Sequence, residues 1–171
     1  MIYPIVKYGQ PVLEQKAATI TEFDTPELHK LVEDMFESMY AARGVGLAAP
    51  QIGIGRRLAV IDITTGEDPD KKIVLINPEV VSKGGSQTAE EGCLSLPTFR
   101  ETVTRALRVS VRAQDALGKT FEMAGEDLLA RAFLHEIDHL NGRLYISHIS
   151  PLKRDLIRRK IRKLQKAEEW G

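Results

Sequence analysis

Residues 134–140, LHEIDHL, carry the clearest chemical pattern in the sequence. His135 and His139 are four residues apart, so on an α-helix their imidazoles would lie on one face and could bind one cation. Glu136, beside them, would be the general base for a metal-activated water and would pass the proton to a leaving nitrogen. The pattern therefore predicts metal-assisted hydrolysis.

A helical projection shows where these side chains would face. At about 100° per residue, the two histidines lie along the edge of an apolar stripe that includes Leu128 and Ala132. Glu136 falls inside the stripe, whereas Arg131 and Asp138 fall on the far side. A lone buried carboxylate is costly unless a cation is near. This favours a metal over the alternative, in which the histidines are hydrogen-bonded core residues and the glutamate pairs with an arginine.

Two histidines leave a catalytic zinc-type site one protein ligand short. Tyr145 stands where one protease pattern has a third histidine, and the only later glutamates lie in the polar tail. His148 would have to fold back from the loop after the helix. Cys93, the only cysteine, is the strongest remaining candidate because a thiolate is a good ligand for zinc or Fe(II). By elimination, the site is predicted to consist of Cys93, His135, His139 and a water.

Three separated segments resemble the signature motifs of the peptide deformylase family, in the same order and at similar spacing. They are GVGLAAPQIG at 44–53, EEGCLSLP at 90–97 and FLHEIDHLNG at 133–142. The segments INPEV and SPLKRDLIRRKIRKL also resemble bacterial members. The resemblance implies that the substrates are N-formylmethionyl peptides, that is, nascent chains, and that hydrolysis of the N-formyl group releases formate.

The same resemblance implies a role for individual residues. The cysteine and the two histidines would bind one divalent metal per chain, with Glu136 as the acid and base. Gln51 and the backbone N–H of Leu94 would hold the developing oxyanion. The family implies Fe(II), and a Cys-His-His site also accommodates Zn, Ni or Co.

Substrate binding is expected to involve the glycine-rich segment and the apolar edge of the helix. Gly44 and Gly46 lack side chains, so an extended peptide could pair with that backbone like an added strand; a tight connection is the alternative. Arg100 matches a position where the family has an arginine near the peptide channel, and a surface arginine is the alternative. The pocket for the substrate's methionine side chain is expected to be lined by Leu128, Ala132 and Val45, for which plain core packing is the alternative.

The elements that must position these residues indicate an α+β fold. A helix is predicted with Thr25 as its N-cap, Pro26 at its first position and Gly44 as its stop. Strands are predicted at 56–64 and 71–81, a strand and hairpin within 100–125, a helix at about 126–140, and a helix after Ser150 and Pro151. The segments 44–55 and 90–93 are predicted to be loops. We expect mixed, mostly antiparallel strands around the central helix that carries H-E-x-x-H, with an N-terminal and a C-terminal helix.

The C-terminal segment 151–171 is predicted to be a basic amphipathic helix. It holds eight Lys or Arg residues between Lys153 and Lys166. One face is predicted to carry Leu156, Ile157, Ile161 and Leu164. A docked helix with a solvated cationic face is one interpretation. Electrostatic attachment to the ribosome, which the resemblance implies, is the other.

Composition limits the remaining classes of function. A chain of 171 residues, 43% of them hydrophobic, is expected to form a single domain, 1–171, with its own core. With 24 basic and 24 acidic residues, the balanced charge argues against coating DNA or a membrane with the whole surface. No stretch approaches the ~18 apolar residues of a membrane span. One cysteine cannot form an internal disulfide, which indicates a reducing, cytoplasmic location.

Two other functions stay open at this level. An H-E-x-x-H metalloendopeptidase would share the chemistry, but Tyr145 and the missing downstream glutamate disfavour it. A non-catalytic metal-binding module would need a fourth protein ligand to close the site, and His148 is the only candidate.

Overall fold

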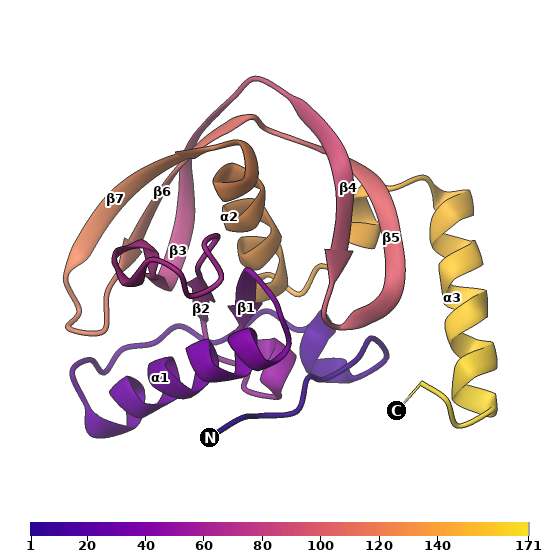
Figure 1. Ribbon diagram of the computed structural model, residues 1–171, viewed down its shortest axis with the longest axis horizontal. Coiled ribbons are helices and arrows are strands. Elements are labelled where there is room, and N and C mark those ends of the chain that lie inside the picture. The colour runs from indigo at the N-terminus through magenta and orange to yellow at the C-terminus, as the bar shows by residue number, and fades with distance from the viewer. Residues whose placement is uncertain (171) are drawn as a thin grey trace.

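Antiparallel strands and three α-helices make up the fold of residues 1–170, as the computed structural model shows (Figure 1). The helices are α1 (Pro26–Ala41), α2 (Asp127–Leu140) and α3 (Pro151–Lys166). The strands are β1 (Gly46–Ala48), β2 (Leu58–Ile61), β3 (Ile73–Gly84), β4 (Gln87–Cys93), β5 (Leu96–Arg105), β6 (Arg108–Gln114) and β7 (Thr120–Glu126). One sheet has five strands in the order β1-β2-β3-β6-β7, and β4 and β5 form a separate pair. All of these pairings are antiparallel, so the predicted α+β class is confirmed.

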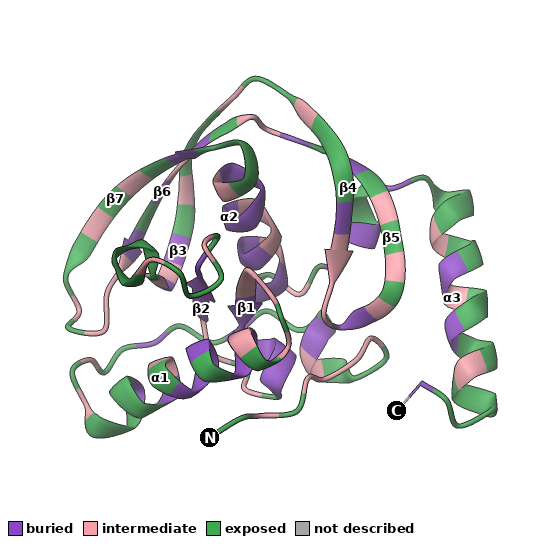
Figure 2. Ribbon diagram, viewed as in Figure 1, coloured by how far each residue is buried: buried purple, intermediate pink, exposed green. Residues whose placement is uncertain are grey.

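The helix α2 lies at the centre of the molecule, between the five-stranded sheet and the β4–β5 pair (Figure 1). Its buried side chains recur at helical spacing, at Ala130, Phe133, Ile137 and Leu140. They pack in one cluster with side chains of the sheet such as Val111, and Figure 2 shows this inward face as buried. Complete burial of a large apolar side chain stabilises a fold by roughly 1.5–3 kcal/mol. Packing on the sheet therefore fixes the helix that carries both histidines.

The N-terminal helix starts where the sequence predicts and ends earlier. The Thr25 Oγ1 accepts a hydrogen bond from the Leu28 N–H at 3.1 Å, and Pro26 occupies the first turn. The helix ends at Ala41 rather than at Gly44, which corrects the prediction. The residue that leaves the helical conformation is Arg43, with a φ of 59°, so a non-glycine residue supplies the left-handed turn.

Two segments predicted as loops contain regular structure. Residues 46–48 form the edge strand β1, where Gly46 faces Ile61 of β2. Residues 87–93 form β4, so the segment before Cys93 is a strand. The strand β1 was missed because three residues are too few to show a period. The strand β4 was missed because its sequence lacks the apolar alternation of a strand in the main sheet, and the β4–β5 pair arches away from that sheet (Figure 1). The other strands differ only at their ends, since β2 covers 58–61 and β3 continues to Gly84.

The basic helix α3 is present and docks on the domain. The Ser150 Oγ caps it by accepting a hydrogen bond from the Lys153 N–H at 3.2 Å. Ile157 and Ile161 are buried, and Leu164 packs partly against the same cluster. Leu156, predicted to share that face, is 47% exposed, which corrects the prediction. Figure 2 shows one narrow buried stripe on an otherwise exposed helix.

Across residues 1–170, no helix combines the length and the apolar character required to cross a membrane.

A buried aspartate closes the turn after β2. The Asp62 carboxylate accepts hydrogen bonds from the Thr64 N–H at 2.9 Å, the Thr64 Oγ1 at 2.6 Å, the Gly66 N–H at 3.0 Å and the Tyr40 hydroxyl at 2.5 Å. Burial by itself would raise the pKa of Asp62, but these hydrogen bonds outweigh it and hold the pKa below its ordinary value. Burial and the same aspartate raise the pKa of Tyr40 to about 12. The carboxylate is therefore ionised in the folded protein and links α1 to the turn.

Replacement of Asp62 should lower stability in a pH-dependent way. Asp62→Ala leaves buried donors unpaired, so the free energy of unfolding at pH 7 should fall by about 1–3 kcal/mol. Because the folded pKa lies below the unfolded value of about 3.9, this contribution is complete above that value and is lost as the pH falls through the folded pKa. Urea unfolding at about pH 7, 5 and 2.5 should show the same difference between the two proteins at the two higher values and a smaller one at the lowest, which lies below the unfolded pKa. The control Asp70→Ala, at an exposed site, should change little, and an equal difference at every pH would contradict the assignment.

Candidate active site

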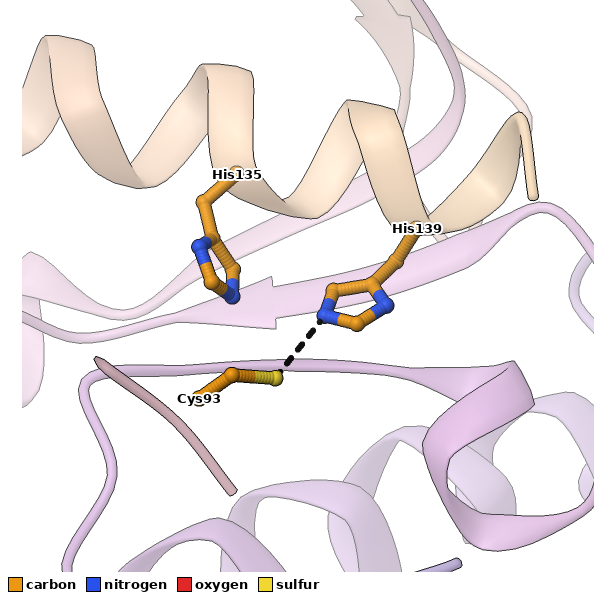
Figure 3. Close-up of side chains that lie close together, drawn as sticks. All are labelled: Cys93, His135 and His139. Carbon is orange, nitrogen blue, oxygen red and sulfur yellow. Dashed lines mark hydrogen bonds between the residues drawn. The ribbon is translucent and has the colours of Figure 1, made fainter. Parts of the chain in front are cut away.

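His135 and His139 lie one turn apart on α2 and point toward the thiol of Cys93, at the end of β4 (Figure 3). The imidazole centroids are 5.0 Å apart, and the Cys93 Sγ lies 3.3 Å from the His139 Nε2. One ligand atom from each residue lies within 4.8 Å of the other two. Two ligands of one zinc-sized ion, at bond lengths of about 2.0–2.3 Å, are about 3.5 Å apart. The donor set and its spacing therefore fit a single metal ion.

Glu136 lies buried beside these ligands with one oxygen unpaired. Its side chain is 3% exposed, and its Oε1 has no hydrogen-bond partner among the described residues. Burial raises the pKa of Glu136 to about 7, although the charge of His135 opposes the shift. The arginines of the site pair with Glu91, so the alternative of a Glu136–arginine pair is not what the structure shows. A buried polar atom without a partner needs an explanation such as a water or an ion.

Gly46 of β1 is the residue against which Glu136 packs. A Cβ added at this glycine would lie 2.5 Å from the Glu136 Oε2, so any side chain here would displace the carboxylate. The Glu136 side chain covers the face of Gly46 from which a Cβ would project. A peptide could therefore contact Gly46 only through the backbone edge of β1 that does not pair with β2. Position 46 therefore requires glycine because the carboxylate of Glu136, the predicted base, lies directly against its backbone.

The orientation of His135 is set by Glu91, which was not among the residues predicted from the sequence. The Glu91 carboxylate contacts the His135 Nδ1 at 2.5 Å and accepts hydrogen bonds from the Arg131 Nη1 at 2.6 Å and the Arg105 Nη2 at 2.6 Å. Burial opposes ionisation, but the hydrogen bonds from His135 and Arg105 hold the pKa of Glu91 well below its usual range. Because Nδ1 is engaged, Nε2 is the atom left for a cation.

Arg131 and Asp138 do not lie on a solvent-facing side of α2, which corrects the helical projection. Arg131 is 6% exposed. Asp138 accepts hydrogen bonds from the Arg105 Nη1 at 2.7 Å and is 2.8 Å from the His148 Nε2. A projection of one helix assumes one covered side, whereas the β4–β5 pair covers a second side of α2 (Figure 1). His148 is therefore held by Asp138, and the cluster of ligand atoms in residues 1–170 does not include it.

One signal could have identified Glu91. In a strand, residues two apart face the same side, so Glu91 and Cys93 would have been placed together if residues 90–93 had been predicted as a strand. The arginines carry no such signal, because their partner is about 14 to 40 residues away in the sequence.

A cavity of about 590 Å³ opens above these groups. Eleven of the twelve predicted site residues line it, namely Gly44, Val45, Gly46, Gln51, Cys93, Leu94, Arg100, Leu128, Ala132, His135 and Glu136. The twelfth, His139, lies behind them and is fully buried. Leu128 is 47% exposed at the rim, whereas Ala132 is buried. Residues 96–99 of β5 complete the wall.

Gln51 and Leu94 are both neighbours of the cysteine. The Gln51 Nε2 is 3.6 Å from the Cys93 Sγ and 3.3 Å from the Ser95 Oγ, and its Oε1 accepts a hydrogen bond from the Ala48 N–H at 3.0 Å. The acceptor end of the amide is thus occupied and its donor end faces the ligands. Leu94 begins the turn between Cys93 and Leu96, and a Cβ at Gly44 would lie 2.9 Å from its Cδ1.

Comparisons with known proteins agree with this arrangement. The profile of the family described as "Polypeptide deformylase" matches residues 2–155. The peptide deformylase of Acidobacterium capsulatum is 64% identical over 170 residues, 99% of each chain. The crystal structure of a Legionella pneumophila peptide deformylase has a TM-score of 0.90 and 48% identity over 98% of each chain. That of a Synechococcus elongatus peptide deformylase in complex with actinonin has a TM-score of 0.86 and 36% identity, over 92% of this chain and 86% of that chain. The chain belongs to the peptide deformylase family and is a metal-dependent enzyme that removes the N-formyl group from nascent polypeptides.

Proposed function

We propose that Cys93, His135 and His139 bind one divalent metal ion and that Glu136 transfers the proton during hydrolysis of the formyl amide. One observation supports this above all: beside three converging ligand atoms, at the base of the cavity, lies a buried carboxylate with an oxygen that is unpaired among residues 1–170. When bound, the metal supplies Lewis-acid activation of a water and of the formyl carbonyl. The products are formate and a peptide with a free amino group.

Glu136 is proposed to act as both proton acceptor and proton donor. A water adds to the formyl carbon, and Glu136 takes its proton. When the C–N bond breaks, the same carboxyl group gives a proton to the methionine nitrogen. Burial raises the pKa of Glu136 to about 7, and a group with a pKa near the working pH can both accept and return a proton.

Gln51 and the Leu94 N–H are proposed to stabilise the oxygen of the formyl group as it gains charge. The Gln51 amide is oriented before substrate binds, because its Oε1 is held by the Ala48 N–H. Leu94 lies in the turn next to Cys93, so its N–H would be close to a formyl group bound at the proposed metal site. Preorganised donors of this kind contribute roughly 3–4 kcal/mol each to the transition state.

The substrate chain is proposed to pair with β1. This strand is the edge of its sheet and pairs only with β2 among the strands of residues 1–170, so its free side can accept an added strand. The methionine side chain would enter the apolar part of the cavity beside Val45, Leu128 and Ala132. Arg100, 59% exposed and 3.5 Å from the Glu90 carboxylate, would meet the peptide at the mouth.

The two competing functions lack support in the same geometry. An endopeptidase of this pattern needs a histidine or glutamate as third ligand, and in residues 1–170 the third member of the ligand cluster is Cys93. A closed structural site needs a fourth ligand, and His148 is held by Asp138.

Glu136→Gln should separate chemistry from metal binding. The ligands are unchanged, so metal content should stay at the wild-type level, while kcat for formate release from formyl-Met-Ala-Ser should fall by roughly 100- to 10,000-fold. Cys93→Ser should instead lose both metal and turnover with the fold retained. Glu122→Gln, on the exposed side of β7, is the matched control and should keep full activity. Formate release by Glu136→Gln at a near wild-type rate would rule out the mechanism.

Fe(II) is the metal we infer for this site. One thiolate and two imidazoles accommodate Fe(II), Zn, Ni or Co, and the likeness to the deformylase family favours Fe(II). Protein purified without oxygen should contain about one iron per chain and lose activity in air as the iron and thiolate oxidise. Metal analysis and formate release on the same sample test this, and a zinc-containing, air-stable active enzyme would contradict it.

A cytoplasmic location stays a prediction from the single cysteine.

Ribosome binding by α3 is proposed as a further property. Arg154 is not free for it, because its guanidinium bonds the carbonyls of Ile146 and Ile149. Lys153 is exposed but lies 3.6 Å from the Glu101 carboxylate. Five further basic side chains on α3 are exposed: Arg159, Lys160, Arg162, Lys163 and Lys166. They form a cationic face opposite the docked isoleucines, as contact with phosphates requires.

Charge reversal on this face tests the proposal. Arg159→Glu combined with Lys163→Glu leaves Ile157 and Ile161 in place, so α3 should stay docked. Co-sedimentation with ribosomes should weaken and become less salt-dependent. The control Lys83→Glu with Lys119→Glu makes the same change in net charge at exposed sites elsewhere and should bind as the wild type does. Equal binding by both double variants would refute a specific role for α3.

A further inference from the structure

The wall of the substrate cavity on β5 contains a bulge. Gly92 of β4 faces Arg100, whereas Cys93 faces Leu96, so residues 97–99 have no partner strand residue on β4. Thr98 has a φ of 72°, a conformation that β-branched residues seldom adopt. All three bulge residues line the cavity. Because ladder hydrogen bonds do not hold this stretch, its position depends on what packs behind it.

Trp170 packs behind the bulge. Its ring lies edge-on to the ring of Phe99, with the centroids 6.0 Å apart and an interplanar angle of 64°. The tryptophan is 6% exposed. After α3, Glu168 adopts a left-handed φ of 57° and the Glu169 N–H bonds the Leu164 carbonyl at 2.8 Å. The chain thereby folds back toward the body of the molecule (Figure 1).

The same tryptophan is hydrogen-bonded toward the turn beside the metal ligands. The Trp170 Nε1–H donates to the Tyr8 carbonyl at 2.8 Å, and the Tyr8 N–H donates to the Ser95 carbonyl at 2.8 Å. Ser95 in turn accepts, through its Oγ, a hydrogen bond from Gln51 at 3.3 Å. Two separate contacts therefore connect Trp170 to the cavity: one to the bulge and one to the turn after Cys93.

We propose that Trp170 is a positioning residue for the part of the cavity that receives substrate residues after the formyl-methionine. The formyl group must lie at Glu136 and the metal ligands, whereas the bulge leads to Arg100 at the exposed mouth. A shift of Phe99 would therefore disturb the following residues of the peptide more than the reacting amide. The proposal rests on the deformylase activity, but Trp170 lies beyond residue 155, where the match to the family profile ends.

Kinetics with a long and a short substrate test this on the metal-loaded enzyme. For Trp170→Ala, KM for formyl-Met-Ala-Ser should rise roughly 3- to 10-fold, as expected for loss of one aromatic pair, with kcat nearly unchanged. Neither constant should change for formyl-methionine amide, which has no following residue. Trp170→Phe keeps a ring against Phe99 and should restore most of the KM. An equal loss on both substrates would overturn the proposal.

Ile157→Ala is the matched control for simple loss of docking. Ile157 is 4% exposed in the same apolar cluster as Trp170 but belongs to the first half of α3. The Ile157→Ala substitution should lower the thermal midpoint of unfolding while leaving KM unchanged for both substrates. If Ile157→Ala reproduced the KM change, the effect would belong to α3 docking in general and not to Trp170.

Fluorescence of the wild-type enzyme provides a test that needs no variant, because Trp170 is the only tryptophan. Titration with the product Met-Ala-Ser should change the emission of Trp170 saturably, at the concentration at which the peptide inhibits turnover. Methionine amide should inhibit without that change. Inhibition by Met-Ala-Ser without any change in emission would overturn the proposal even if Trp170→Ala failed to fold. Failure of the proposed hydrolytic mechanism would show separately, as near wild-type formate release by Glu136→Gln.

Discussion

The ion pairs of the buried Glu91 carboxylate are the interaction on which the rest of the site depends. Three cationic or hydrogen-bonding partners from β5 and α2 meet on this one group: Arg105, Arg131 and His135. A buried ionised carboxylate is tolerated only when it is paired and hydrogen-bonded in this way. Because Glu91 is two residues before Cys93 on β4, the same contacts hold the strand with the thiol against the helix with the imidazoles. The network thus brings the proposed metal ligands together and also fixes the orientation of His135.

Two buried glutamates that both interact with His135 differ in their pKa shifts because their surroundings differ. Glu91 is surrounded by cations, which keep its pKa well below the usual range despite burial. Glu136 packs against Gly46, and one of its oxygens has no partner in the described part of the chain, so burial raises its pKa to about 7. One carboxylate is suited to hold structure, and the other to exchange a proton. Pairs of acids whose environments push their pKa values apart are typical of hydrolytic sites.

The remaining elements each supply one boundary of the cavity. The sheet fixes α2 through apolar packing, the edge strand β1 lies under Glu136, and the β4–β5 pair forms the opposite wall. The bulge in that wall is not secured by its own strand pairing and relies on Trp170. A basic helix at the end of the chain therefore contributes both a cationic surface and, through the residue that follows it, part of the support for the cavity.

The sequence by itself determined the α+β class, the three helices and the β6–β7 hairpin, and it predicted the donor set proposed for the metal. These follow from local patterns: Thr25 and Ser150 cap helices through bonds to residues three positions away, and the H-E-x-x-H spacing is a property of one helix. The choice of Cys93 as third ligand also came from the sequence, because Tyr145 stands where a third histidine would be and the later glutamates lie in the polar tail.

Only the tertiary structure decided the burial of Arg131, the role of Glu91, the engagement of His148 with Asp138 and the packing of Trp170 on Phe99. Each of these contacts joins residues between 10 and 71 positions apart, on different elements. No short-range period encodes such a contact. Whether a helix has one covered side or two, and which buried charge meets which partner, depends on how the β4–β5 pair folds over α2, and that is a property of the whole chain.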